Sequence, residues 1–423
     1  MRLPVITLFV VLSLTLVGFW LNRGANKALH EEFRSRVITH AVGPAGSCEG
    51  NPLGAGEKRA LPQFPYKCGW NYVSSGGGID VFAYTMPSGQ LGWSNCALIV
   101  DTNEQQSILI DVFQDVSNTE EMLEGVKNIT QKAPIKRVLI THPDFDHFFG
   151  TAAIPKPIPI YSSQVVADVV LHANQTKMNQ QLFSFAILGS VVSGMLNVIK
   201  DIPVVGEHVQ PLLKKLIDAI PLKGSTFGRG MAFSFAYLTP FKMSSVDHVR
   251  PVDVLLEDVD WKIHGAKLSL VNFRAHSKDD TAVLIPSAGV AIAGDLLFQG
   301  VYPLIKYGST ADIIEALDAL LADHRIKVFV PGHGPITDRA GVEREKRLWL
   351  ALQASAKTCF ENDEKVDDCV KRFQADAQEK FEERDCEVML EISYLTDIAT
   401  LKGERPSEQI FMDRFGKHIL SKL

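Results

Sequence analysis

Cysteine is scarce in this sequence. Its 423 residues include six cysteines, and no two of them have the Cys-x-x-Cys or Cys/His spacing of a zinc knuckle. So few cysteines exclude a small disulfide scaffold, and their spacing excludes a structural zinc finger. The sequence also lacks a long block of one charge, since 43 basic and 49 acidic residues give a net charge of −6. We therefore expect no nucleic-acid partner.

The remaining composition is that of a folded chain, with 46% hydrophobic and 22% charged residues. These proportions exclude disorder throughout, collagen-like repetition and a multi-span channel. The length leaves room for one large domain or two ordinary ones.

The first 30 residues differ from the rest of the chain. Residues 3–22 carry no charge, and Arg2 and Arg23 flank them. This length suits a helix that crosses a bilayer, and a small-x-small cleavage site is hard to find after it. We interpret residues 1–30 as an uncleaved signal anchor, with a cleaved signal peptide or a soluble N-terminal helix as alternatives. The membrane is then a partner through this helix.

Two further features favour export of the body of the chain. Asn128 and Asn174 begin acceptor triplets, which predict a glycoprotein in a host that glycosylates. Five cysteines are candidates for disulfides, in a Gly/Pro-rich stretch and in a charged tail: Cys48, Cys68, Cys359, Cys369 and Cys386. Their connectivity stays open, and unpaired core cysteines are the alternative. Cys96 lies in an apolar run and is predicted to be a buried free thiol. We expect a membrane-anchored or secreted protein with its main domain on the extracytoplasmic or lumenal side.

The body of the chain alternates strands and helices. Residues 31–78 are rich in Gly, Pro and polar residues, so we interpret them as a linker with a local disulfide. Short β-branched and aromatic runs then predict strands over 79–86, 96–100, 107–112, 136–141, 267–273, 281–286, 290–293 and 328–331. Helical spacing predicts helices over 116–132 and 311–324. This order indicates an α/β arrangement of layers.

A helical insertion, at about residues 165–245, separates the two halves. Residues 178–199 carry no charge and leave almost no polar face, and residues 209–220 form a sharply amphipathic pattern. The insertion is either a helical cap packed on the core or a lid that binds membrane or lipid. Residues 341–423 are highly charged with helical spacing, and we interpret them as a solvated helical tail.

Ionisable side chains are concentrated directly after the predicted strand at 136–141. His142, Asp144, Asp146 and His147 fall within six residues. Such groups would repel and desolvate one another at a strand end unless a divalent cation supplied the counter-charge. In an extended loop, residues 142 and 144 point the same way, while 146 and 147 can turn to a second position. One loop could therefore serve two adjacent metals.

Three more candidate ligands follow other apolar strands. His276 follows 267–273, Asp295 follows a glycine after 290–293, and His333 lies between two glycines after 328–331. Loops at strand ends gather into a site, and the glycines beside His333 allow a sharp turn. These placements predict metal binding, whereas the other eight histidines lack this context.

With these residues, the chain resembles the metallo-β-lactamase fold superfamily, whose pattern is H-x-H-x-D-H, then His, then Gly-Asp, then Gly-His-Gly. The resemblance covers roughly residues 79–340 and implies a four-layer αββα sandwich with a helical cap insertion. It also implies a binuclear metal site. One metal would be held by His142, Asp144 and His276, the other by Asp146, His147 and His333, and Asp295 would bridge the two.

Asp144 departs from the family pattern, because histidine is commoner at this place. A carboxylate adds negative charge and a harder ligand, which weakens the preference for zinc relative to iron or manganese. The resemblance implies two divalent metal ions, with Zn²⁺ as the first choice.

The implied activity is hydrolysis. Two neighbouring divalent ions can share a hydroxide and polarise a substrate oxygen, so we expect a metal-dependent hydrolase that cleaves an ester-type bond. Asp146 is expected to orient the hydroxide. The apolar insertion and the anchor favour an apolar or lipid-like small molecule as substrate, and Phe298, where some lactonases carry tyrosine, disfavours a lactonase. The alternatives are a di-iron oxidoreductase of the same fold and a catalytically silent binding protein.

Overall fold

The computed structural model describes residues 69–85, 94–113, 116–172, 249–256, 262–263, 266–381 and 387–404, together with residues 410 and 414. The predicted signal anchor, most of the predicted linker and the greater part of the predicted insertion lie outside the described residues. The same is true of Cys48, Cys68, Cys386 and the glycosylation triplet at Asn174.

One sheet has seven strands, which follow one another in sequence order. They are β1 (Gly69–Gly76), β2 (Ile79–Thr85), β3 (Cys96–Asp101), β4 (Gln106–Ile110), β5 (Ile135–Leu139), β6 (Ile160–Ser162) and β7 (Val254–Leu255). Strands β1 to β4 pair antiparallel, and β4 to β7 pair parallel. The carboxyl ends of β4 and β5 therefore lie at one edge of the sheet.

The end of the predicted linker belongs to this sheet. β1 pairs with β2 through a turn at Gly77 and Gly78, whose φ angles are 62° and 81°. Trp70 and Val73 of β1 are buried. The prediction of a linker as far as residue 78 is therefore wrong at its end, because a glycine pair with positive φ forms a tight hairpin turn as readily as a flexible connection.

The second half forms a five-stranded sheet. Its strands are β10 (Ser269–Phe273), β11 (Asp280–Ile285), β12 (Val290–Phe298), β13 (Val328–His333) and β14 (Thr337–Asp338), and a separate short hairpin joins β8 (Lys262–Ile263) to β9 (Ala266–Lys267). β12 and β13 pair parallel, with an irregularity in register at Gly294. β12 continues five residues past its predicted end at 293, so Asp295 lies within a fully buried strand.

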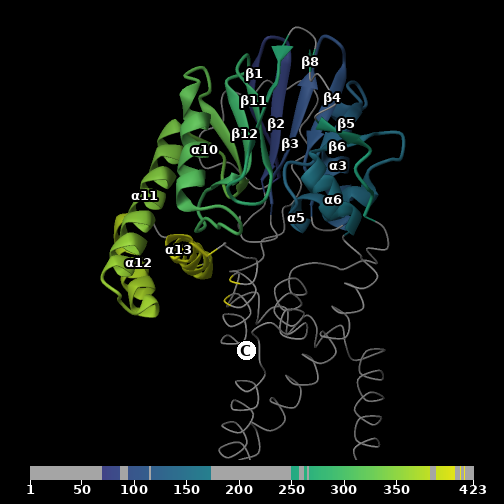
Figure 1. Cartoon of the computed structure of the whole chain (residues 1–423). Coiled ribbons are helices and arrows are strands. Elements are labelled where there is room, and N and C mark those ends of the chain that lie inside the picture. Colours follow the sequence, from purple (N-terminus) through teal and green to yellow (C-terminus); the bar gives the residue numbers. More distant parts are fainter. Residues whose placement is uncertain are drawn as a thin grey trace, which may run out of the picture. The chain divides into compact units, whose positions relative to one another are not determined.

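The two sheets pack face to face. Their β-branched and aliphatic residues form one core, with contributions such as Ile79, Val81, Ile99 and Ile108 from the first sheet and Val283, Val290, Ile292 and Val330 from the second. Helices α10 (Thr310–Ala322) and α11 (Arg339–Glu361) cover the outer side of the second sheet, and α3 (Val116–Gly125) and α6 (Gln164–His172) lie on the outer side of the first (Figure 1). The short helix α4 (Lys127–Thr130) follows α3. The predicted four-layer αββα sandwich is confirmed.

The C-terminal helices are packed on the body rather than extended into solvent. α12 (Val366–Lys380) and α13 (Glu387–Leu401) follow α11, and the fully buried side chains include Leu348 and Trp349 of α11 and Tyr394 of α13. The predicted helices are present, but the interpretation as a solvated tail is wrong. The many charges lie on the outer faces, and they concealed apolar positions that recur at three- and four-residue spacing.

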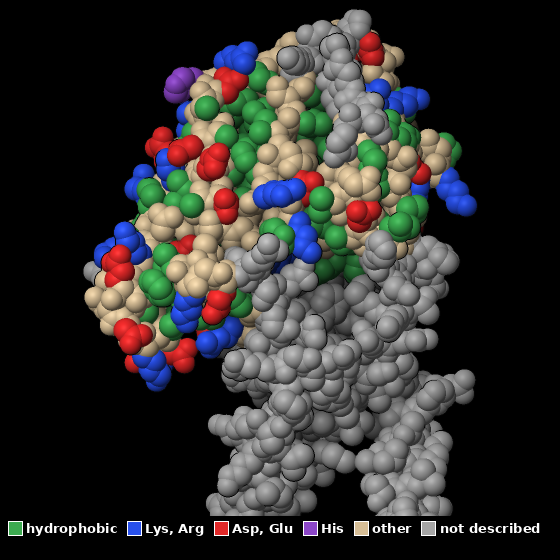
Figure 2. Space-filling model, viewed as in Figure 1, with side chains coloured by type: hydrophobic (Ala, Val, Ile, Leu, Met, Phe, Trp, Pro, Cys, Tyr) green, Lys and Arg blue, Asp and Glu red, His purple; other side chains and the backbone are tan. Residues whose placement is uncertain are grey.

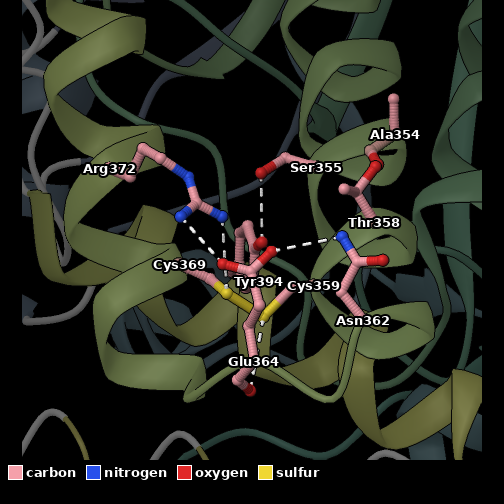
Figure 3. Close-up of a disulfide and its surroundings, with 9 residues drawn as sticks. All are labelled: Ala354, Ser355, Thr358, Cys359, Asn362, Glu364, Cys369, Arg372 and Tyr394. Carbon is pink, nitrogen blue, oxygen red and sulfur yellow. Dashed lines mark hydrogen bonds and ion pairs between the residues drawn. A yellow bond between two sulfur atoms is a disulfide. The ribbon is translucent and has the colours of Figure 1, made fainter.

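A disulfide between Cys359 and Cys369 joins the end of α11 to α12 (Figure 3). Beside it, Arg372 and Glu364 form an ion pair of 2.9 Å. The Tyr394 hydroxyl of α13 makes a 3.0 Å hydrogen bond with Oγ of Ser355 in α11. A disulfide in the tail was predicted, and Cys96 is buried and free as expected.

Acidic and basic side chains are interspersed on the face shown in Figure 2, including over α11 and α12. None of the helices among the described residues combines the length and apolar character that a bilayer crossing requires. Asn128, in the one glycosylation triplet that the structure describes, is exposed on α4, and its modification stays a prediction.

Candidate metal centre

The strand ends of both sheets place the candidate ligands. His142 follows β5, and Asp144 is the N-cap residue of a short helix, α5 (Phe145–Phe148), that contains Asp146 and His147. The second half of the predicted extended loop is thus helical, and this turn directs residues 146 and 147 to a different position from residue 142. A 3₁₀ turn, η1 (Phe149–Ala153), continues the segment.

One group of ligand atoms gathers around Asp144. The Nε2 atom of His276 lies 3.0 Å from Oδ2 of Asp144, and Nε2 of His142 lies 3.7 Å from the same oxygen. Both imidazoles also approach Oδ2 of Asp295, at 3.5 Å for His142 and 3.4 Å for His276. Atoms of these four buried side chains all lie within 4.8 Å of one another, which is close enough to share one cation.

A second group gathers around Asp146, His147 and His333, whose atoms also lie within 4.8 Å of one another. The Nε2 atom of His333 lies 3.4 Å from Oδ2 of Asp146 and 3.3 Å from Oδ2 of Asp295. The Nε2 atom of His147 lies 3.1 Å from Oδ1 of Asp295. Asp295 therefore stands between the two groups. The structure brings all seven predicted residues together, in the two sets that the sequence analysis assigned.

Two glycines make room for Asp295. A Cβ on Gly332 would lie 1.9 Å from Oδ1 of Asp295, so any larger residue would displace the carboxylate. Gly294, directly before Asp295, has a φ of 54° and lies against Thr141. The turn that carries His333 is held by Asn95, whose backbone N–H donates to the carbonyl of Gly332 at 2.7 Å.

Three of the four imidazoles use Nδ1 to bind an oxygen of the surrounding protein. Nδ1 of His147 donates to Oδ2 of Asp111 at 2.9 Å, and Nδ1 of His276 donates to the carbonyl of Leu304 at 2.7 Å. Nδ1 of His142 contacts Oγ1 of Thr141 at 2.9 Å, and that hydroxyl in turn donates to Asp111 at 2.7 Å. These bonds fix the ring orientations and leave Nε2 of each ring facing the centre, which is the arrangement of metal-binding histidines.

Lys306 contributes a positive charge. Its ammonium group contacts Oδ2 of Asp144, and its side chain is 14% exposed. Burial by itself would lower the pKa of Lys306, but the carboxylate of Asp144 outweighs burial and raises the pKa above its ordinary value. Lys306 therefore stays protonated beside the first group of ligands.

With protons as the only counter-charge, His142 and His147 become strongly basic. Burial and His147 lower the pKa of His142, but Asp295 and Asp144 outweigh them and raise it to about 10. Burial also opposes protonation of His147, yet the carboxylates of Asp295 and Asp111 raise its pKa well above the usual range. Conversely, the surrounding imidazoles outweigh burial and hold the pKa of Asp295 well below its usual range. The buried carboxylates thus demand positive charge, from protons or from cations.

The donor atoms fit a pair of divalent cations. Nε2 of His142, Nε2 of His147 and Oδ1 of Asp295 are fully buried and make no hydrogen bond within the described part of the chain. Leaving such atoms without a partner is costly, and a metal ion bound to them would remove the cost. Mixed imidazole and carboxylate ligands suit zinc, iron and manganese.

Several residues of the site were not predicted as such. Asp111 follows β4 directly, so the rule that selected the other strand-end residues could have selected it. Lys306 and Leu304 lie in the loop between β12 and α10, and no local pattern distinguishes them. Phe298, noted only for substrate choice, stacks on the ring of His333 with a centroid distance of 5.2 Å and an interplanar angle of 3°.

The sequence matches a known protein family. The sequence profile of the metallo-beta-lactamase superfamily matches residues 91–333, which is more than half of the chain and contains every candidate ligand. A search of curated protein sequences finds no match.

Solved structures of this fold are similar in architecture. A metallo-beta-lactamase from Pontibacter korlensis is 16% identical, with a TM-score of 0.40 and a match over 66% of this chain and 99% of that one. FIM-1 from Pseudomonas aeruginosa, solved in its mono-zinc form, is 17% identical, with a TM-score of 0.38 over 69% of this chain and 98% of that one. A double mutant of the sec-alkyl sulfatase PisA1 is 13% identical, with a TM-score of 0.50 over 79% of this chain and 50% of that one. At these identities the likeness concerns the fold alone.

Proposed function

The chain belongs to the metallo-β-lactamase superfamily, and on this premise we propose that it is a metal-dependent hydrolase of an ester-type bond. The observation that carries the proposal is the convergence of four histidines and three aspartates into two adjacent buried groups. His142, Asp144 and His276 would hold one metal and Asp146, His147 and His333 the other, with Asp295 shared. When bound, two such ions supply a hydroxide at neutral pH and polarise the oxygen of the scissile bond.

The chain's own residues would hold the metals and orient the attacking nucleophile. The carbonyl of Asp146 accepts a 2.5 Å hydrogen bond from Oγ of Ser94, which fixes the start of α5. We assign the carboxylate of Asp146 the role of orienting the attacking nucleophile by accepting a hydrogen bond from it, in addition to holding the metal, since it lies within 3.4 Å of His333 at the centre of the site. No serine or cysteine nucleophile is required.

For the substrate, we propose an apolar or lipid-like ester. The apolar pattern of the 178–220 insertion supports this choice, and the fold is shared with an enzyme named as a sec-alkyl sulfatase, whose substrate class combines an ester with an alkyl chain.

The test combines metal analysis with a substrate panel. The purified protein should contain zinc, iron or manganese, and it should hydrolyse long-chain acyl or sulfate esters faster than short polar ones, with activity lost to chelator and restored by metal. His147→Ala should lower kcat/KM by several orders of magnitude, whereas His324→Ala, at an exposed site just after the end of α10, should not change it. Near-normal turnover by metal-depleted protein would contradict hydrolysis by a metal centre.

The same metal analysis addresses the two other classes of function. Asp144 favours harder metals, so bound iron with a visible absorption band and oxygen consumption would support a di-iron oxidoreductase. A content below one metal per chain would support a silent binding protein.

We also propose that the body of the chain faces an oxidising compartment outside the cytosol. The Cys359–Cys369 disulfide supports this location, because disulfides persist in secreted and lumenal proteins. Protease protection of the intact chain in isolated membranes tests it, and a cytosolic location with both thiols reduced would contradict it.

A further inference from the structure

We propose that helix α13 supports the metal centre, because its residue Ser393 positions the loop that contacts the ligands of the first metal. The loop consists of residues 303–310, which follow β12 and end at the first residue of α10, and it is called the 303–310 loop below. This inference rests on the proposed metal-dependent function, and it assigns a role to the C-terminal helices that the superfamily match, which ends at residue 333, does not cover.

The 303–310 loop supports the first group of ligands from two directions. The carbonyl of Leu304 accepts the Nδ1–H of His276 at 2.7 Å, and the ammonium group of Lys306 contacts Asp144. The loop also runs beside the backbone of the β10 end: the N–H of Lys306 donates to the carbonyl of His276 at 3.0 Å, and that of Gly308 donates to Ala275 at 2.9 Å. One ligand of the first metal, His276, is thus oriented by this loop, and Lys306 of the loop places a positive charge beside another, Asp144.

Helix α13 holds the loop in turn. Oγ of Ser393 accepts the N–H of Ile305 at 3.0 Å and donates to the carbonyl of Pro303 at 3.1 Å, so one hydroxyl clamps the backbone on both sides of Leu304. At the other end of the loop, Oγ1 of Thr310 donates to Oδ1 of Asp397 at 2.5 Å. Ser393 and Thr310 are fully buried, so water cannot replace these bonds.

The second group of ligands is supported from elsewhere. Asp111, after β4, binds His147, and Ser94 binds the carbonyl of Asp146. Asn95 holds the turn of His333. A change at Ser393 should therefore act on the first metal position and spare the second, which is a selectivity that general loosening of the fold would not produce.

The experiment measures metal binding to the full chain. Protein stripped with chelator is titrated with Zn²⁺ against a chromophoric competitor, and Co²⁺ spectra record the ligand field at each position. Wild type is expected to bind two ions. Ser393→Ala is expected to bind one ion normally and the other about 10-fold more weakly or worse, within the 10–100-fold range typical of supporting groups. Ser393→Thr, which keeps the hydroxyl, should restore the affinity of the first metal position.

Tyr394→Phe is the matched control, because it removes a hydrogen bond that the same helix makes with Ser355 in α11 rather than with the loop. It should bind two ions like wild type. If Ser393→Ala does not fold, Thr310→Val provides the same test from the other end of the loop. Two unchanged affinities in these variants, equal loss of both ions, or the same loss in Tyr394→Phe would overturn the positioning role. A wild type that binds no ion would instead contradict the proposed function.

Discussion

The carboxylate of Asp111 binds Nδ1 of His147 at 2.9 Å, and this contact aims Nε2 of His147 at Asp295, 3.1 Å away. Asp111 has a φ of 61° and also accepts the N–H of Thr141 at 2.7 Å. A carboxylate in this position sets the tautomer of the imidazole and raises its basicity as a ligand. The orientation and the tautomer of the His147 ring therefore depend on Asp111.

We predict that Asp111→Asn weakens metal binding at the second position. Asparagine tolerates the positive φ, so the fold should persist. Its amide cannot accept from both Thr141 and His147, and an N–H facing Nδ1 would move the imidazole proton to Nε2. The expected loss in affinity is about 10–100-fold by competitive titration. Asp101→Asn, a buried carboxylate at the end of β3 that caps Asn103 and Glu104, is the control and should leave affinity unchanged.

We predict that Lys306→Met destabilises the metal-stripped protein and strengthens binding of the first metal. Removing the ammonium takes away the positive partner of the buried Asp144 carboxylate. This should lower the free energy of unfolding by about 3 kcal/mol, at the lower end of the usual range, because His276 still contacts the carboxylate. A divalent cation would then compensate for the same charge. Chemical denaturation with and without Zn²⁺ should show a larger stabilisation by metal in the variant than in wild type.

Lys346→Met is the control for this charge effect. Lys346 pairs with Asp318 at the surface, where their side chains are 26% and 53% exposed, so its removal should cost less than about 1 kcal/mol. An equal metal-induced stabilisation in Lys306→Met and wild type would show that Lys306 does not contribute to the charge of the site.

The metal-stripped protein should lose stability as pH rises. The pKa of His142 is raised to about 10 in the folded state, above the ordinary value of about 6.5 in the unfolded chain. A raised pKa contributes stability that is fully present below about pH 6.5 and is lost as pH rises towards about 10. Urea denaturation across this window measures the effect. Constant or rising stability of the stripped protein between these pH values would refute it.

Metal binding, by contrast, should weaken as the pH becomes acidic. Because the ligands must release protons to bind a cation, metal affinity should fall as pH is lowered, and binding should release protons. Calorimetry in buffers of different ionisation enthalpy counts these protons. Binding without proton release would indicate that the imidazoles were already neutral.

We predict that Gly332→Ala abolishes binding of at least one metal. The added Cβ would meet Oδ1 of Asp295 at 1.9 Å, and this carboxylate contacts ligands of both groups. Gly289→Ala is the matched control, since Gly289 has a φ of 70° and lies against the carbonyl of Arg325, away from the site. It should lower stability by about 1–2 kcal/mol and keep both metals. Two metals bound by Gly332→Ala would exclude the bridging role of Asp295.

The candidate ligands could be found in the sequence because each follows a short apolar run. His142 after β5 and His333 at the end of β13 illustrate the rule, in which local alternation defines a strand and the polar residue past its end faces the site. The same rule placed Asp295 after a strand, whereas the structure places it inside β12. An irregular register at Gly294 allowed the strand to continue, and such an irregularity depends on the neighbouring strand β13.

The C-terminal helices show the opposite case. Their helical spacing was visible in the sequence, but their many charges suggested a solvated tail. Trp349 and Tyr394 are nevertheless buried against the body of the chain. A charged outer face and a buried inner face occur in one helix, so composition alone misjudges burial.

By itself, the sequence determined the strands that precede the ligands, the seven ligand types and their order, because these depend on patterns within a few residues of each other. Only the tertiary structure decided what surrounds the ligands. Lys306 meets Asp144 across 162 residues of chain, and Ser393 meets Ile305 across 88. Contacts of this kind arise where separately formed layers pack, so no local pattern encodes them, and they set the charge and the orientation of the side chains that the local pattern supplies.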